Sequence, residues 1–109
     1  MARRVDAYRV PEVRDRAPDL RLAGDIDSYA LRKLRLDVNF AFRNNDDSDF
    51  VIDVSQATFF DSAGLAVLAR ACMHSSQVGH NAILRGASDE LRRLLSIAGM
   101  DQMFVYDET

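Results

Sequence analysis

The sequence is poor in cysteine: Cys72 is the only one among 109 residues, and there is no tryptophan. A single cysteine cannot form an internal disulfide, and its presence without a partner favours a reducing compartment, so we expect a cytoplasmic protein. It also excludes a zinc site built on paired cysteines. The main apolar run, residues 63–69, is far shorter than the roughly 20 residues of a membrane span, and we expect no span. No apolar segment follows the basic start, residues 1–4, so no export signal is predicted.

An excess of charge of one sign is also missing. The formal net charge is −3 and the isoelectric point is about 5.2, which argues against nucleic acid as a partner. Apolar residues make up 48% of the chain and charged residues 28%, a balance typical of a globular rather than a disordered chain. This length allows one hydrophobic core, and hence one domain.

The usual marks of an enzyme are absent as well. There is no glycine-rich phosphate loop, and His74 and His80 lie six residues apart, a poor spacing for a metal site. Cys72 falls on an apolar helix face and is expected in the core. We therefore expect no enzyme activity, no cofactor and no metal. Two further groups receive structural interpretations: packing for Met73, Met100 and Met103, and a solvated loop for the acids at positions 46, 47 and 49.

Short apolar runs predict strands that alternate with helices. Phe50–Val54 is nearly continuous and β-branched, which indicates a central strand covered on both faces. Leu20–Ala23 alternates in polarity and is expected to end at Gly24. Further short strands are predicted at residues 7–10, 82–84 and 103–106.

Three amphipathic helices separate these strands. The first is expected to be capped by Asp27 or Ser28, and the third to begin at Ser88. Gly79 and Gly99 are expected just after the second and third helices. The inner faces are predicted to be Leu31, Leu34, Val38 and Ala41; then Leu65, Leu68, Ala69, Cys72 and Met73; then Leu91, Leu94, Leu95 and Ala98. This alternation predicts an α/β domain with a mixed, mostly parallel sheet of four to five strands and three or more helices packed against it.

Ser62 stands where an apolar link, ending in Phe59-Phe60, passes into the second helix. Its hydroxyl could simply cap that helix. The alternative is a phosphorylation site, because the free N–H groups and the positive dipole end of a helix start tolerate a phosphate. Such a phosphate would repel a partner packed over this helix start.

Three segments in order resemble the STAS domain family, and most closely its bacterial anti-sigma factor antagonists. The likeness runs from about Leu20 to Tyr106. It is carried by Gly24-Asp25-Ile26-Asp27, by Phe50-Val51-Ile52-Asp53-Val54 with the later Asp61-Ser62-Ala63-Gly64-Leu65, and by Leu91 to Met100. It divides the chain into an N-terminal segment (1–19), a STAS domain (20–106) and a tail (107–109).

The resemblance implies a protein-binding switch. In this family the serine after the motif aspartate, here Ser62, is phosphorylated by a partner that is both anti-sigma factor and serine kinase. The unphosphorylated form binds that partner and releases a sigma factor, and a PP2C-type phosphatase restores it. The implied partner surface comprises Asp25, Asp27, Ser28, Asp61, Ser62, Ala63, Gly64 and Leu65. The free form is expected to be a monomer or a weak dimer.

The sequence departs from the family pattern in three places. Ala63 replaces a second hydroxyl and leaves Ser62 as the sole acceptor in the motif, Ala66 stands where a glycine is frequent, and the segment before Leu20 matches the family's opening hairpin poorly. STAS domains are also scaffold subunits of stress-sensing assemblies and small cytoplasmic subunits of lipid or anion transporters. These two roles are the alternatives to the switch.

Overall fold

The computed structural model describes residues 16–45 and 48–107. Its elements alternate along the chain: β1 (Leu20–Ile26), α2 (Ser28–Arg43), β2 (Phe50–Phe60), α3 (Ser62–Gln77), β3 (Ala82–Arg85), α4 (Asp89–Ile97), a 3-10 turn η2 (Asp101–Met103) and β4 (Val105–Asp107). The strands form one sheet in the order β1-β2-β3-β4, and all three pairings are parallel. The predicted α/β class is confirmed. The strand expected at residues 7–10 lies outside the described residues.

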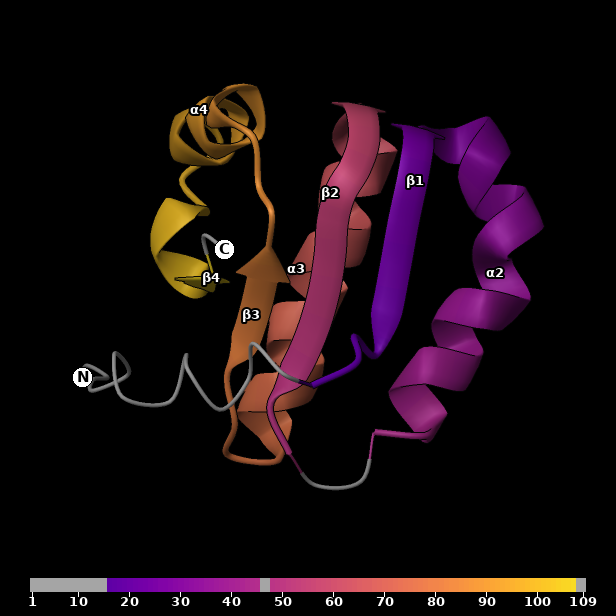
Figure 1. Ribbon diagram of the computed structural model, residues 1–109, viewed down its shortest axis with the longest axis vertical. Coiled ribbons are helices and arrows are strands. Elements are labelled where there is room, and N and C mark those ends of the chain that lie inside the picture. The colour runs from indigo at the N-terminus through magenta and orange to yellow at the C-terminus, as the bar shows by residue number, and fades with distance from the viewer. Residues whose placement is uncertain (1–15, 46–47, 108–109) are drawn as a thin grey trace.

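The helices bury one face of this sheet. In Figure 1, α3 crosses behind β2 and β3, α2 runs beside β1, and α4 lies beyond β3. The core between them combines strand residues such as Ile26, Phe50 and Leu84 with helix residues such as Leu68 and Leu95, all fully buried. Parallel strands are joined by crossover connections, here helices, and these helices pack on the sheet and cover it. None of the helices in the described part is long and apolar enough to cross a bilayer.

The ends of the helices follow local chemistry, as predicted. Asp27 caps α2 by accepting from the N–H of Ala30 at 2.9 Å, and Ser88 caps α4 by accepting from the N–H of Leu91 at 3.0 Å. Gly79 and Gly99 follow α3 and α4 with φ of 78° and 75°. Glycine takes this left-handed conformation without a Cβ clash, and so ends both helices.

The strand β2 is longer than its apolar run indicated. It continues through Phe60, so the assignment of Phe59-Phe60 to a link was wrong. Its register against β1 shifts twice, and each time β2 carries one extra residue, between the pairs Arg21↔Asp53 and Ala23↔Gln56 and again after Gly24↔Ala57. Such bulges hide the period-2 pattern by which strands are recognised. The expected end of β1 at Gly24 was wrong too, because the strand continues to Ile26.

The buried face of α3 is rotated from the predicted one. Its buried residues are Gly64, Val67, Leu68, Ala71, Cys72 and Ser75. Met73 was assigned to packing but is 59% exposed, and Met103 is 43% exposed. Apolar residues surround most of this helix, so periodicity alone did not identify the face that contacts the sheet. On α4, Leu91 and Leu95 are buried as predicted, whereas Ala98 is exposed.

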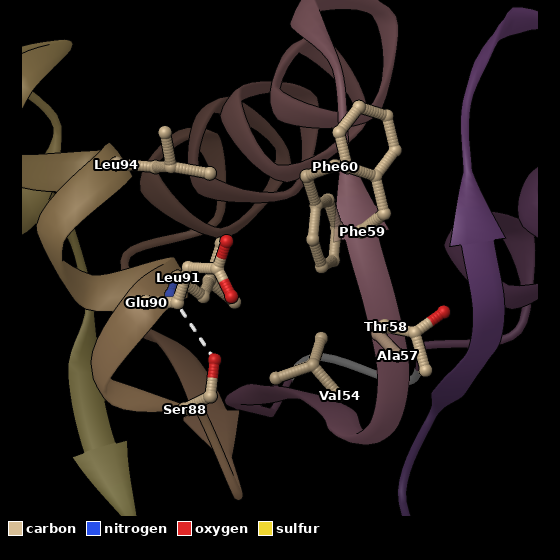
Figure 2. Close-up of a pocket in the computed structure, with 9 residues that line it drawn as sticks. All are labelled: Val54, Ala57, Thr58, Phe59, Phe60, Ser88, Glu90, Leu91 and Leu94. Atoms are coloured by element: carbon tan, nitrogen blue, oxygen red, sulfur yellow. Dashed lines mark hydrogen bonds between the residues drawn. The ribbon is translucent and has the colours of Figure 1, made fainter.

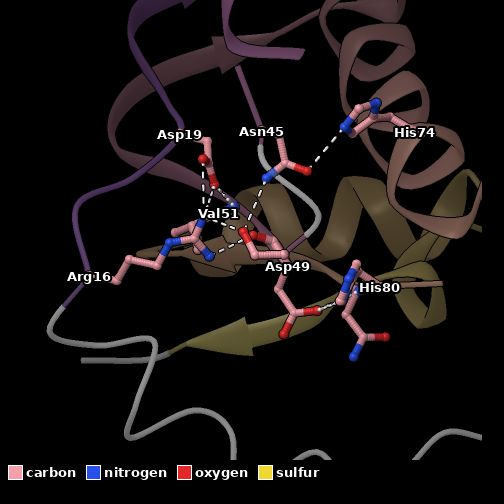
Figure 3. A network of polar contacts seen from close by, with 9 residues as sticks. Arg16, Asp19, Asn45, Asp49, Val51, His74 and His80 are labelled. Carbon is pink, nitrogen blue, oxygen red and sulfur yellow. Dashed lines mark hydrogen bonds and ion pairs between the residues drawn. The ribbon is translucent and has the colours of Figure 1, made fainter. Parts of the chain in front are cut away.

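A polar network closes the amino end of the sheet (Figure 3). The Arg16 guanidinium donates to the backbone oxygen of Asp49 at 2.6 Å and to the carboxylate of Asp19 at 2.9 Å. The Asp49 carboxylate accepts from the N–H of Asn81 at 2.9 Å and lies 3.4 Å from Nδ1 of His80. Asp49 is only 3% exposed, so its assignment to a solvated loop was wrong. Asp46 and Asp47 lie outside the described residues.

A row of alternating charges crosses the sheet on the face away from α3. Arg21, Asp53, Arg85 and Asp107 are register partners on β1 to β4. The Nε–Oδ2 distance is 3.8 Å from Arg21 to Asp53 and 3.2 Å from Arg85 to Asp107. Partial burial favours the neutral form of Asp53, but hydrogen bonds from the N–H and hydroxyl of Ser55 and the charges of Arg21 and Arg85 outweigh it, so the pKa of Asp53 is lowered.

Candidate partner-binding site

The start of α3 is organised around Asp61 rather than Ser62. The Asp61 carboxylate accepts from the N–H of Gly64 at 3.0 Å, which makes Asp61 the N-cap. Ser62 is the first residue of the helix, and it is exposed. Capping by the Ser62 hydroxyl was therefore the wrong interpretation. The serine keeps its hydroxyl on the surface of the first helical turn.

Gly64 sets how closely α3 approaches the sheet. A Cβ atom at this position would overlap the backbone oxygen of Ile26 on β1 and lie 3.0 Å from the ring of Phe60. Leu65, the next residue, is half-buried and packs against the core. Both residues hold the helix start in place, and Gly64 is buried beneath the surface that Ser62 shares with the half-buried Ala63.

The start of α2 repeats this arrangement on the neighbouring strand. Asp27 is the N-cap and Ser28 is the exposed first residue of the helix. Ile26 and Phe60, the last residues of β1 and β2, are register partners, and the N–H of Asp61 lies 3.4 Å from the oxygen of Ile26. Two Asp-Ser pairs, 34 positions apart in the chain, are thus brought to one edge of the sheet.

A third carboxylate belongs to the same edge. Asp25, near the end of β1, is exposed and accepts a hydrogen bond from the hydroxyl of Thr58 on β2 at 2.9 Å. With Asp27 and Asp61, it gives this edge three carboxylates beside two helix N-termini, whose dipoles favour negative charge. The arrangement can hold an exposed hydroxyl in an acidic surface.

An open cavity adjoins this edge between β2 and α4, and no motif in the sequence indicated it. Its volume is about 140 Å³, and its lining includes Phe59 and Phe60 from β2 with Leu91 and Leu94 from α4 (Figure 2). The cavity arises because β3 pairs only with Phe50–Asp53. On that side, the later part of β2 faces α4 instead of another strand. Such a cavity depends on the unequal lengths of two strands, which are not visible locally.

The groups considered for catalysis lie away from this edge. Cys72 is buried in the core, as predicted, and burial raises the pKa of its thiol to about 12, so the thiol remains protonated at neutral pH. His74 contacts the Asn45 side chain at 3.2 Å near the opposite end of α3. No group of three possible metal ligands occurs within residues 16–45 and 48–107.

Comparison with known proteins gives relatives for this arrangement. The chain is 29% identical over 85 residues to the anti-sigma-B factor antagonists of Listeria monocytogenes and Listeria innocua, a span covering 78% of this chain and 74% of each relative. Its fold matches the anti-sigma factor antagonist SpoIIAA in its unphosphorylated form, with a TM-score of 0.62, 17% identity, and coverage of 85% of this chain and 83% of that one.

A second solved structure is equally similar in fold. The sulfate transporter family protein from Wolinella succinogenes matches with a TM-score of 0.63 and 16% identity, over 83% of this chain and 78% of that chain. The family model described as "Mlab, STAS domain" matches residues 11–106. Because this match spans most of the chain, the chain belongs to the STAS domain family.

Proposed function

We propose that this chain is an anti-sigma factor antagonist whose switch residue is Ser62. The unphosphorylated protein binds an anti-sigma factor that is also a serine kinase, and the bound anti-sigma factor releases a sigma factor. Phosphorylation of Ser62 by that kinase ends the binding, and a PP2C-type phosphatase restores it. The names of the two Listeria relatives and the likeness to SpoIIAA support this role.

One observation carries the proposal: Ser62 is exposed at the first position of α3 while Asp61 makes the cap. A phosphate on Ser62 therefore displaces none of the hydrogen bonds that begin the helix. It would also lie among N–H groups of the first turn and at the positive end of the helix dipole. The domain is expected to keep its fold after modification.

The same phosphate would oppose a partner. Asp25, Asp27 and Asp61 already surround this edge of the sheet, and phosphorylation adds a charge of about −1.5 to −2. A partner covering the helix start would have to bury that charge next to like charges, which costs several kcal/mol. Since each ~1.4 kcal/mol changes an affinity tenfold, one phosphate is enough to switch binding.

Titration calorimetry with the purified anti-sigma factor tests the proposal. We expect Ser62→Asp to weaken binding by about a hundredfold, equivalent to about 3 kcal/mol, and Ser62→Ala to bind like the wild type. Ser96→Asp is the matched control, because Ser96 is an exposed serine on α4, and its variant should bind normally. Equal affinity of Ser62→Asp and wild type would contradict the switch.

Mass spectrometry tests the chemistry separately. After incubation with the partner kinase, ATP and Mg²⁺, we expect one phosphate on Ser62 and none on the Ser62→Ala protein. A phosphate that persists in Ser62→Ala would assign the modification to another hydroxyl.

The likeness to the Wolinella protein and the family description favour a second candidate function. In it the chain is a scaffold subunit of a stress-sensing assembly, or a small subunit bound to a lipid or anion transporter, and Ser62 takes no part in assembly. Light scattering on the purified protein separates the candidates: a very large particle supports the scaffold, and a small species supports the switch. A transporter subunit would keep its complex in the Ser62→Asp variant.

A further inference from the structure

The outer face of α2 carries three of the most exposed large apolar side chains in the described part of the chain. Leu36 is 73% exposed, Tyr29 61% and Phe40 60%. They are spaced seven and four residues apart, so they share one face of the helix, here called the α2 stripe. Val38 and Ala41 are the buried residues of α2 and turn toward the core. The helix therefore has a second apolar face that points outward.

Cations flank the α2 stripe. Arg32, Lys33 and Arg43 are exposed, and each lies three or four residues from a stripe residue. Lys33 Nζ is 4.9 Å and Arg32 Cζ is 5.8 Å from the centre of the Tyr29 ring, so the charges are in contact with the apolar surface.

This helix is also opposite in charge to the remainder of the protein. It contains four cations and one carboxylate, a net charge of +3, whereas the whole chain has −3. Outside α2 the net charge is therefore −6. Figure 1 shows this positively charged helix at the outer edge, next to β1.

These properties select among possible occupants of the stripe. A second copy would place like-charged helices against each other, and nucleic acid would leave Leu36 and Phe40 facing phosphates. A surface with negative charge on the outside and an apolar layer beneath would match both the α2 stripe and the cations beside it. The apolar side chains would enter the apolar layer while the Arg and Lys head groups stay at the charged layer. Tyrosine is enriched at that boundary in membrane proteins.

We propose that the α2 stripe docks this protein on an anionic lipid surface, with the axis of α2 parallel to the bilayer. Tyr29 and Phe40 lie about 16 Å apart along the axis at 1.5 Å per residue, which suits shallow contact rather than insertion. This proposal is independent of the function proposed for Ser62, since no stripe residue belongs to that site.

Sedimentation with lipid vesicles tests the proposal on the full chain. We expect the wild type to bind vesicles of phosphatidylcholine and phosphatidylglycerol in equal parts at low ionic strength. Binding to phosphatidylcholine alone should be at least tenfold weaker, and added salt should weaken binding to the mixed vesicles. The double variant Leu36→Ser/Phe40→Ser should lose about tenfold or more in affinity for the mixed vesicles.

A matched control distinguishes binding through the α2 stripe from nonspecific binding through any exposed apolar residue. Ile97 on α4 is 78% exposed, so Ile97→Ser removes an equally exposed apolar residue elsewhere and should leave vesicle binding unchanged. Arg32→Gln and Lys33→Gln should each weaken binding about fivefold. Circular dichroism is used to confirm that every variant is folded.

Three results would overturn the proposal. The first is no sedimentation of the wild type with the mixed vesicles. The second is an equal loss in Ile97→Ser and in the double stripe variant. The third is a concentration-dependent dimer in light scattering that the stripe variant abolishes, because the stripe would then join two copies of the chain.

Discussion

Carboxylates lie at both ends of the sheet, but their hydrogen-bond partners and their exposure differ between the two ends. At the carboxyl end, Asp27 and Asp61 accept from helix N–H groups, and Asp25 accepts from a hydroxyl. At the amino end, Asp19 is paired with Arg16 and Asp49 lies beside His80. Asp49 is 3% exposed, whereas Asp25 and the neighbouring Ser62 are on the surface.

This difference separates a structural end from the end that we propose binds the partner. The carboxylates at the amino end contact the Arg16 guanidinium, the His80 ring and backbone N–H groups, so their interactions remain within the fold. Those at the carboxyl end bond only to neutral donors among the described residues, and leave acceptor capacity and negative charge at the surface. Substitutions at the first end should therefore change stability most, and substitutions of exposed side chains at the second end, such as Ser62, should mainly change binding.

Asp49→Ala is expected to have the largest effect on stability. It leaves the Asn81 N–H and His80 without the buried carboxylate, at a cost of about 3 kcal/mol in the free energy of unfolding, measured by urea denaturation. Asp49→Asn keeps an acceptor oxygen and should lose about half as much. A loss below about 0.5 kcal/mol in Asp49→Ala would remove the distinction between the two ends.

Gly64→Ala is expected to have the next largest effect, because Gly64 is buried at the carboxyl end, between α3 and β1. Alanine normally stabilises a helix by about 1 kcal/mol over glycine, but here its Cβ would overlap the backbone oxygen of Ile26. We expect a net loss of about 2 kcal/mol in urea denaturation. Ser62→Ala, two residues earlier and exposed, is the control and should stay within about 0.5 kcal/mol of wild type. A Gly64→Ala protein more stable than wild type would show that α3 does not need its close approach to β1.

The two caps at the carboxyl end should give smaller and similar losses. Asp61→Ala and Asp27→Ala each remove one hydrogen bond to a helix N–H and should cost about 1 kcal/mol by thermal or urea unfolding. The asparagine variants keep a capping oxygen and should lose only a few tenths of that. If only one of the alanine variants is destabilised, the two Asp-Ser starts are not equivalent in structure.

Asp53, between the two ends, should give the smallest effect and one that depends on pH. Its pKa is lowered in the folded state, so it stabilises the fold above its ordinary pKa, and this contribution is lost as the pH falls through the lowered value. Asp53→Asn should therefore be less stable than wild type at neutral pH, and the difference should vanish once the pH has fallen below the lowered pKa of Asp53. Urea midpoints at several pH values measure this. A difference that persists in acid would point to packing rather than charge.

Much of the architecture was predictable because it depends on neighbours in the chain. Asp27, Ser88 and Gly79 act on backbone groups within one helical turn, so their roles follow from residue type and spacing. Ser62 was also singled out from its position at the start of a helix, but its hydroxyl was weighed as a possible cap, whereas the cap is Asp61. Both Asp61 and Ser62 have side chains that can cap α3. Which of them does so depends on where the end of β2 places the chain relative to Ile26.

The remaining errors involve contacts between distant residues. The buried carboxylate of Asp49 bonds to the N–H of Asn81, 32 positions away, and nothing around Asp49 in the sequence marks it as buried. The two extra residues of β2 can be identified only by comparing its residues with their pairing partners on β1. The orientation of α3 depends on the side of an almost uniformly apolar helix that meets the sheet, and Met73 shows that the predicted side was shifted.

Local patterns in the chain were therefore enough to predict the order of strands and helices, the ends of most helices and an exceptional serine at a helix start. These features rest on hydrogen bonds and periodicity within a few residues. That the starts of α2 and α3 lie side by side was implied only by the family resemblance, and the register of β1 and β2 shows it. Only the folded structure shows that Gly64 lies against the backbone of β1 and that the α2 stripe faces outward. Each of these depends on which segments pack against one another, and packing joins residues that local patterns do not relate.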